Sequence, residues 1–301
     1  MDPALLERLQ FLGGSFLLLL FFSSMAWKLG FFQIPNLQFN PPPRIALSDV
    51  LGIFALFLCV EVLLVPTIAF LWFSYKQGHW LTSTNFRLSS DEQGWFNLMA
   101  VVFSALAVVG YCFMMRSDLR QLVFWGTWKQ GGLQRAYRQF YTGASTWLLG
   151  YPSIVITGQI VGIILMLWGP TKHVDQTAVR HLKSTLSSPP LFWATILGII
   201  FLVPIAEEIL FRGFLQRWLV QNLSTWKGIV CASAIFAAFH FSFSQGIDNI
   251  ELLLSLFVLG CFLGYVYERQ GTLWASIGLH VTFNAISVLM IVFQEATKQC
   301  A

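Results

Sequence analysis

The chain has 301 residues, of which 56% are hydrophobic and only 11% are charged. Because a soluble domain normally carries about 25% charged residues, this composition excludes an ordinary soluble protein. The net charge of +4 is small and spread over the chain, so it gives no reason to expect nucleic-acid binding. Repeated apolar runs of roughly 17 to 24 residues fit helices that cross a hydrocarbon core of about 30 Å. We therefore predict an all-α, polytopic membrane helix bundle.

The apolar runs predict about eight transmembrane helices, which follow one another along the whole chain. In chain order, the predicted spans are residues 9–27, 50–73, 96–115, 145–168, 191–209, 228–243, 250–268 and 273–293. The first run ends in small residues like a signal peptide, but its leader carries as many acids as bases, so we expect an uncleaved span. We divide the chain into N-terminal transmembrane helices at 1–145, with an interfacial basic-aromatic loop at 116–144, and a C-terminal helical bundle at 146–301.

Basic and aromatic residues are interleaved in the loop after the third predicted span. They are Arg116, Arg120, Lys129, Arg135 and Arg138, with Trp125, Trp128, Tyr137 and Tyr141. This mixture favours a position at the headgroup level of an anionic leaflet. The loops on this side hold eleven Lys and Arg, against seven in the opposite loops and the termini. The positive-inside rule therefore predicts a multi-pass membrane protein with this loop, and the end of the fifth span, on the cytoplasmic side.

Three charges lie at the end of the fifth predicted span, in the sequence EEILFR at residues 207–212. A charged side chain inside a bilayer costs at least about 3 kcal/mol, so this group indicates a functional site. On a helix, Glu208 and Arg212 are four residues apart with the acid first, the order that favours an ion pair. Glu207 lies about 100° around the helix and is left free as a candidate base. The alternative is a salt-bridge network that only ends the span.

Two later spans carry the remaining polar residues. His240 follows Phe236 by one turn in the sixth span, and alone it is more often a satisfied core residue than a catalyst. His280 and Asn284 share one face of the eighth span, so both can donate towards one point. Their alternative role is interhelical hydrogen bonding, typically worth about 0.6 kcal/mol per contact. Because burying three separate polar clusters costs several kcal/mol, we predict that they meet Glu207 in one hydrated cavity.

The motifs EExxxR, FxxxH and HxxxN, in this order on successive helices, resemble those of the CPBP family. This family comprises type II CAAX prenyl endopeptidases, bacteriocin-processing and immunity proteins, and related proteins described as intramembrane metalloproteases. The resemblance covers residues 190–295, about a third of the chain. It implies an intramembrane endopeptidase that hydrolyses a peptide bond of a membrane-associated or lipidated protein by attack of water.

The resemblance also implies a role for each matched residue. Glu207 is implied to be the general base that activates the water, with His240 sharing that water. Glu208 supports the site through Arg212. The remaining pair, His280 and Asn284, is implied to donate to the oxyanion of the tetrahedral intermediate, where a lost donor typically costs about 100- to 1000-fold in rate.

Two accounts of water activation stay open. Glu207, His240 and His280 have the composition of a two-His, one-carboxylate site, in which a divalent metal such as zinc would lower the pKa of its bound water to about 7. In the other account the glutamate acts without a metal. Other intramembrane protease types are excluded: all six Asp lie outside the predicted spans, no His is followed by Glu, and there is no G-x-S-x-G element.

Two further functions remain as alternatives to the protease. The first is a non-proteolytic scaffold or immunity factor that keeps the same fold. The second is a proton-coupled transporter with Glu61, Glu207 and His240 as a proton relay, although no inverted repeat is visible. The expected partners are membrane lipid and a membrane or lipidated protein substrate, and the sequence gives no indication of oligomeric state.

Overall fold

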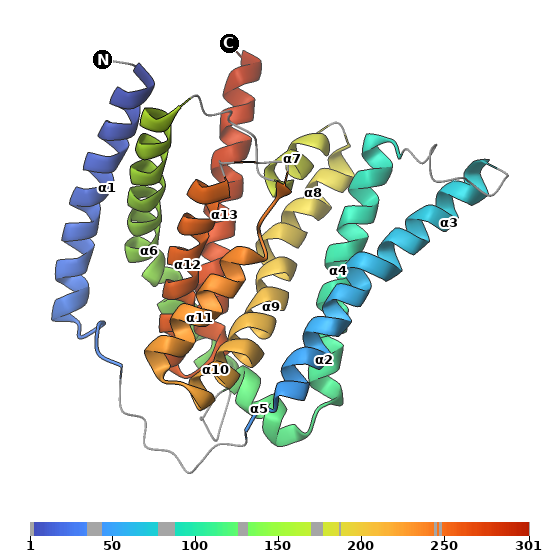
Figure 1. Ribbon diagram of the computed structural model, residues 1–301, viewed down its shortest axis with the longest axis horizontal. Coiled ribbons are helices and arrows are strands. Elements are labelled where there is room, and N and C mark those ends of the chain that lie inside the picture. The colour runs from blue at the N-terminus through green and yellow to red at the C-terminus, as the bar shows by residue number, and fades with distance from the viewer. Residues whose placement is uncertain are drawn as a thin grey trace.

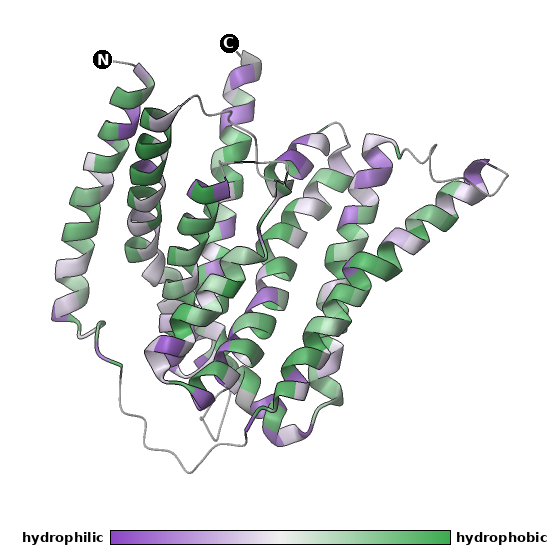
Figure 2. Ribbon diagram, in the orientation of Figure 1, coloured by the Kyte–Doolittle hydropathy of each residue, from purple (hydrophilic) through white to green (hydrophobic). Residues whose placement is uncertain are grey.

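The chain forms a single bundle of helices. The computed structural model describes residues 3–34, 44–77, 88–125, 132–169, 177–186, 188–243, 246 and 249–300. Within these ranges the regular elements are all helices. Figure 1 shows the long helices side by side, with both termini at the same end of the bundle. In Figure 2 apolar residues dominate the middle of the helices, and polar residues gather towards their ends. The prediction of an all-α, polytopic helix bundle is confirmed.

Among the described residues, seven helices are long and apolar enough to cross a membrane. Four of them are single elements in the N-terminal and C-terminal parts: α1 (Pro3–Lys28), α4 (Ser90–Met114), α12 (Asn249–Gln270) and α13 (Leu273–Cys300). A fifth is α6 (Leu133–Trp168). The other two are continuous runs of several elements, one from Leu47 to Gln77 and one from Pro189 to Asn222. The first run comprises α2 (Leu47–Leu58), the π-helical turn η1 (Cys59–Leu64) and α3 (Val65–Gln77).

The predicted sixth span is a shorter helix than expected. Helix α11 (Thr225–Ala238) has 14 residues, which corresponds to about 21 Å of rise. The described residues therefore contain seven helices with the length of a membrane span and one shorter apolar helix, where the sequence predicts about eight spans. With α11 counted as a pass the number is even, which fits two termini at the same end of the bundle.

The basic-aromatic segment is more helical than the expected loop at 116–144. Helix α5 (Ser117–Trp125) covers its first part, while the predicted interfacial residues Trp128 and Lys129 lie outside the described residues. Helix α6 then begins at Leu133, twelve residues before the predicted span, and has 36 residues. This length corresponds to about 54 Å, so α6 extends well beyond a hydrocarbon core of about 30 Å.

The fifth helix does not end at the charged motif. It runs through α8 (Pro189–Leu197), the π-helical turn η3 (Gly198–Leu202), α9 (Val203–Glu208), a second π-helical turn η4 (Ile209–Gln216) and α10 (Arg217–Asn222). The sequence EEILFR therefore lies inside a helix of 34 residues. The expected boundary at residue 209 was wrong because the charges pack inside the bundle and do not mark its surface.

Helices α6 and α13 approach each other closely through two glycines. A Cβ atom on Gly143 would clash with the backbone of Ala275, and one on Gly278 would clash with the backbone of Phe140. Small residues at such positions let membrane helices pack backbone to backbone. This packing fixes the first half of α13, which carries His280.

Candidate active site

The ion pair predicted from the EExxxR spacing is present and fully buried. Glu208 is 0% exposed and Arg212 is 1% exposed, and Arg212 Nη1 lies 3.3 Å from Glu208 Oε1. That contact lacks hydrogen-bond geometry, since Nη1 has no hydrogen-bond partner. Arg212 also donates from Nη2 to the carbonyl of Gly260 at 3.3 Å, and its guanidinium lies 4.6 Å from the ring centre of Phe236. Helix α12, through Gly260, and helix α11, through Phe236, thus hold this arginine in place.

Glu208 also orients His280 from the other side of the site. The imidazole Nδ1 of His280 lies 2.8 Å from Glu208 Oε1. A carboxylate can only accept a hydrogen bond, so Nδ1 carries the proton and donates. The second ring nitrogen, Nε2, then points to Glu207, with 3.7 Å between Nε2 and Glu207 Oε2.

His240 reaches the same carboxylate from the end of α11. It lies in the turn just after the helix, not inside the span as expected. Its Nδ1 donates to the carbonyl of Phe236 at 2.9 Å, and its ring centre lies 4.9 Å from the ring centre of Phe236. The FxxxH spacing therefore has a physical role, because Phe236 holds the ring and leaves Nε2 3.7 Å from Glu207 Oε1.

Glu207 thus faces two imidazoles that are fixed in the same tautomer. In its neutral form each ring offers an unprotonated Nε2 to an oxygen of Glu207, so acceptors face acceptors across 3.7 Å. A water molecule that donates one hydrogen to the Glu207 carboxylate and the other to an imidazole Nε2 gives each of these two acceptors a donor. The site is open enough for this, since Glu207 is 19% exposed and His240 is 33% exposed.

The sixth predicted residue, Asn284, has a different partner. It lies one turn beyond His280 on α13, and its Nδ2 donates to the carbonyl of Ile199 at 2.9 Å. In the described part of the chain, no hydrogen bond joins Asn284 to Glu207 or to either histidine. The structure therefore brings five of the six predicted residues into direct contact with one another and puts Asn284 at the edge of the group.

Glu207, His240 and His280 are the predicted metal ligands. In the described ranges, no group of three or more His, Cys, Asp or Glu side chains is placed to hold a metal ion. The two imidazoles face different oxygens of Glu207, each from 3.7 Å. We derive no chemical step through a metal, and zinc binding stays a prediction.

Sequence reasoning missed three positions that build the site. The carbonyls of Gly260 and Ile199 accept hydrogen bonds from site residues, and backbone acceptors of this kind leave no trace in a sequence. Pro204 lies three residues before Glu207 within the fifth helix. A proline inside an apolar run is a visible signal, because it cannot donate a backbone hydrogen bond.

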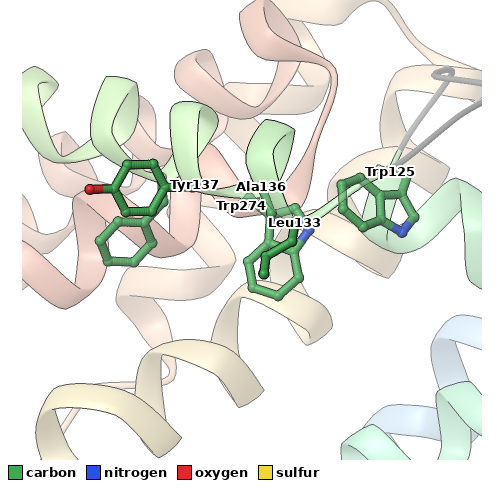
Figure 3. Close-up of a pocket in the computed structure, with 6 residues that line it drawn as sticks. Trp125, Leu133, Ala136, Tyr137 and Trp274 are labelled. Carbon is green, nitrogen blue, oxygen red and sulfur yellow. The ribbon is translucent and has the colours of Figure 1, made fainter.

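An apolar cavity of about 340 Å³ lies at the beginning of α13. Figure 3 shows Trp125, Leu133 and Trp274 around it, with Tyr137 to one side. The remaining lining residues are Ala136 and Phe140, and the rings of Trp125 and Trp274 are 6.0 Å apart. Trp274 precedes His280 by six residues, which corresponds to about 9 Å along the helix.

Comparison with known proteins supports the resemblance noted from the motifs. Residues 189–286 match the family described as type II CAAX prenyl endopeptidase Rce1-like, which confirms the resemblance over this part of the chain. The chain is also 28% identical over 147 residues to the uncharacterised protein YpbD of Bacillus subtilis (strain 168), a match over 48% of this chain and 69% of the relative. An uncharacterised 24.3 kDa protein of Escherichia coli is 26% identical over 145 residues, or 48% of this chain and 62% of the relative. The match thus spans less than two thirds of the second relative, and no solved structure matches the chain.

Proposed function

We propose that this multi-pass membrane protein, with its Rce1-like segment at 189–286, is an intramembrane endopeptidase. The observation that carries the proposal is the arrangement of Glu207 between two imidazole Nε2 atoms, each 3.7 Å from one carboxylate oxygen. In a membrane helix such a group is costly, and it is retained where it performs chemistry.

In the proposed reaction Glu207 takes a proton from a water molecule that His240 helps to hold. The water oxygen then forms a bond to the carbonyl carbon of the peptide, and the carbonyl becomes an oxyanion. When the C–N bond breaks, Glu207 returns the proton to the leaving amine, so the products are a carboxyl group and an amine.

The proposal keeps His280 as the group that stabilises the oxyanion, the role that the family resemblance implies. Its Nδ1–H already bonds to Glu208, so this role requires a second proton, on Nε2. Donors placed in a water-poor site are typically worth about 100- to 1000-fold in rate.

The apolar cavity beside Trp274 favours a substrate that carries a hydrocarbon chain. Its lining is aromatic and aliphatic, and it lies on the same helix as His280. A prenyl group on a cysteine near a C-terminus is one such chain. We therefore include a lipidated substrate class in the proposal.

The geometry gives no comparable support to a proton relay. Glu61 lies in the π-helical turn η1 and accepts a hydrogen bond from Ser104 at 2.7 Å. Across the described ranges, no hydrogen bond or ion pair joins Glu61 to Glu207 or His240. The arrangement of Glu61 is that of an interior carboxylate with a local partner.

The test is a cleavage assay with the purified protein in liposomes. The probes are fluorescent peptides ending in Cys-aliphatic-aliphatic-X, each in a prenylated and an unmodified form. We expect the wild type to cleave, Glu207→Gln to lose at least about 100-fold in rate, and His240→Ala to be strongly impaired. Glu61→Gln is the matched control, since it makes the same change at a membrane carboxylate outside the site.

Equal cleavage by wild type and Glu207→Gln would end the protease proposal. Equal loss in Glu61→Gln and Glu207→Gln would show that the effect is not specific to the site and would contradict the role of Glu207 as the base. The metal content of the purified protein, and the rate after treatment with a chelator, would decide between the two accounts of water activation.

A further inference from the structure

The carbonyl of Ile199 lacks a backbone donor because of a proline five residues later. In an α-helix the N–H of Val203 would bond to Ile199, but it bonds to the carbonyl of Gly198 across the π-helical turn η3. In a continued π-helix the next residue would serve Ile199 instead. That residue is Pro204, which has no N–H.

Asn284 supplies the donor that the helix cannot. Its Nδ2 lies 2.9 Å from the Ile199 carbonyl, and the bond crosses from α13 to the fifth helix. One turn earlier on α13, His280 bonds to Glu208 at 2.8 Å. The two helices are therefore joined by two side-chain bonds, one on each side of Pro204.

We propose that Asn284 is a positioning residue, which fixes the register of the fifth helix against α13 by bonding to the carbonyl that Pro204 leaves without a donor. Glu207 and Glu208 follow Pro204 by three and four residues, so their direction depends on how the helix passes through this irregular turn. This role differs from the oxyanion donor that the family resemblance implies, and it rests on the proposed function of Glu207.

The two roles predict opposite outcomes in a double-mutant experiment. Pro204→Ala restores a backbone N–H that can bond to Ile199 and so replaces the amide of Asn284. A small displacement of a catalytic group can cost about 100-fold in rate, so we expect Asn284→Ala to lower kcat by about this factor. The double variant Pro204→Ala, Asn284→Ala should recover at least about ten-fold of that loss, whereas a missing oxyanion donor gains nothing from Pro204→Ala.

Hydrogen exchange of residues 199–208 in nanodiscs gives a readout that does not depend on cleavage. We expect faster exchange in Asn284→Ala and in the isosteric Asn284→Asp, and a return towards the wild-type rate in the double variant. If Asn284→Ala does not fold, recovery of folding by Pro204→Ala supports the same role.

One combination of results overturns the proposal. In it, Asn284→Ala lowers kcat, hydrogen exchange of residues 199–208 equals that of the wild type, and adding Pro204→Ala does not restore kcat. That outcome would make Asn284 a catalytic donor. Failure of the proposed function looks different, since Glu207→Gln would then be fully active while the exchange results could still follow the predicted order.

Discussion

Arg212 and Glu207 belong to one motif, yet the structure gives them different physical roles. Arg212 is enclosed by an ion pair, a backbone carbonyl and an aromatic ring, whereas Glu207 keeps one side towards the open part of the site. A residue that is fully enclosed contributes mainly to stability, and a residue with a free face can meet a substrate. Substitutions should separate the two.

Arg212→Met should destabilise the protein as well as inactivate it. Removing the guanidinium leaves Glu208 buried without its cation, and breaking a buried pair in this way typically costs about 3–5 kcal/mol. Thermal unfolding in detergent measures the loss. Glu207→Gln should unfold within a few degrees of the wild type, because Glu207 is partly exposed and the buried Arg212 keeps its ion pair with Glu208.

The matched control is Arg116→Gln in the exposed pair between Arg116 and Asp118. An exposed pair is worth at most about 1 kcal/mol, so the unfolding temperature should hardly change. Equal unfolding temperatures for Arg212→Met and wild type would show that the buried pair does not stabilise the fold.

At the scale of elements, the close approach of α6 and α13 fixes the position of His280 in the site. Gly278 packs against the backbone of Phe140, and it precedes His280 by two residues. A methyl group at this position has no flexible neighbour to displace, so the helices must move apart. The position of His280 should then change although its chemistry is intact.

Gly278→Ala should therefore lower both stability and cleavage rate, although alanine is intrinsically the better helix former by about 1 kcal/mol. The control is Gly110→Ala on α4, where a Cβ atom would meet nothing within 4 Å. We expect that variant to be neutral or slightly more stable. Unfolding temperatures and cleavage rates of the two variants provide the check, and equal behaviour would contradict the packing argument.

The sequence predicted the elements better than their irregularities. The i, i+4 spacing of Glu208 and Arg212 predicted their ion pair, which the structure contains. The π-helical turns around this pair were not predictable, since a period of 3.6 residues is assumed in any search for amphipathic helices. The apolar run at 228–243 also put His240 inside a span, while the structure has it just after the end of α11.

At the scale of the whole molecule, hydropathy predicted seven of the eight expected spans as long apolar helices, because burial in lipid leaves a strong signal in composition. The helix ends were less predictable. Polar residues do not always mark the membrane–water boundary. In the fifth helix they pack inside the bundle, and in α6 they belong to a part of the helix that extends beyond the hydrocarbon core. Sequence alone does not distinguish these cases.

The orientation in the membrane is the remaining prediction about the whole molecule. The end of the bundle that holds α5 and the turn between α10 and α11 carries most of the loop Lys and Arg. Arg212 no longer counts as a loop charge, since it is buried in the site, but the excess stays on the same side. The positive-inside rule therefore favours this end in the cytoplasm.

Cysteine labelling of whole cells tests this orientation. In a variant without the five native cysteines, Ser224→Cys follows α10, and Ser184→Cys lies in α7 (Thr177–Ser184) at the opposite end of the bundle. Both serines are exposed. A maleimide that cannot cross membranes should label Ser184→Cys in intact cells, and Ser224→Cys only after permeabilisation. The reverse pattern would put the α5 end outside the cytoplasm, and a substrate would then have to approach the site from the other face of the membrane.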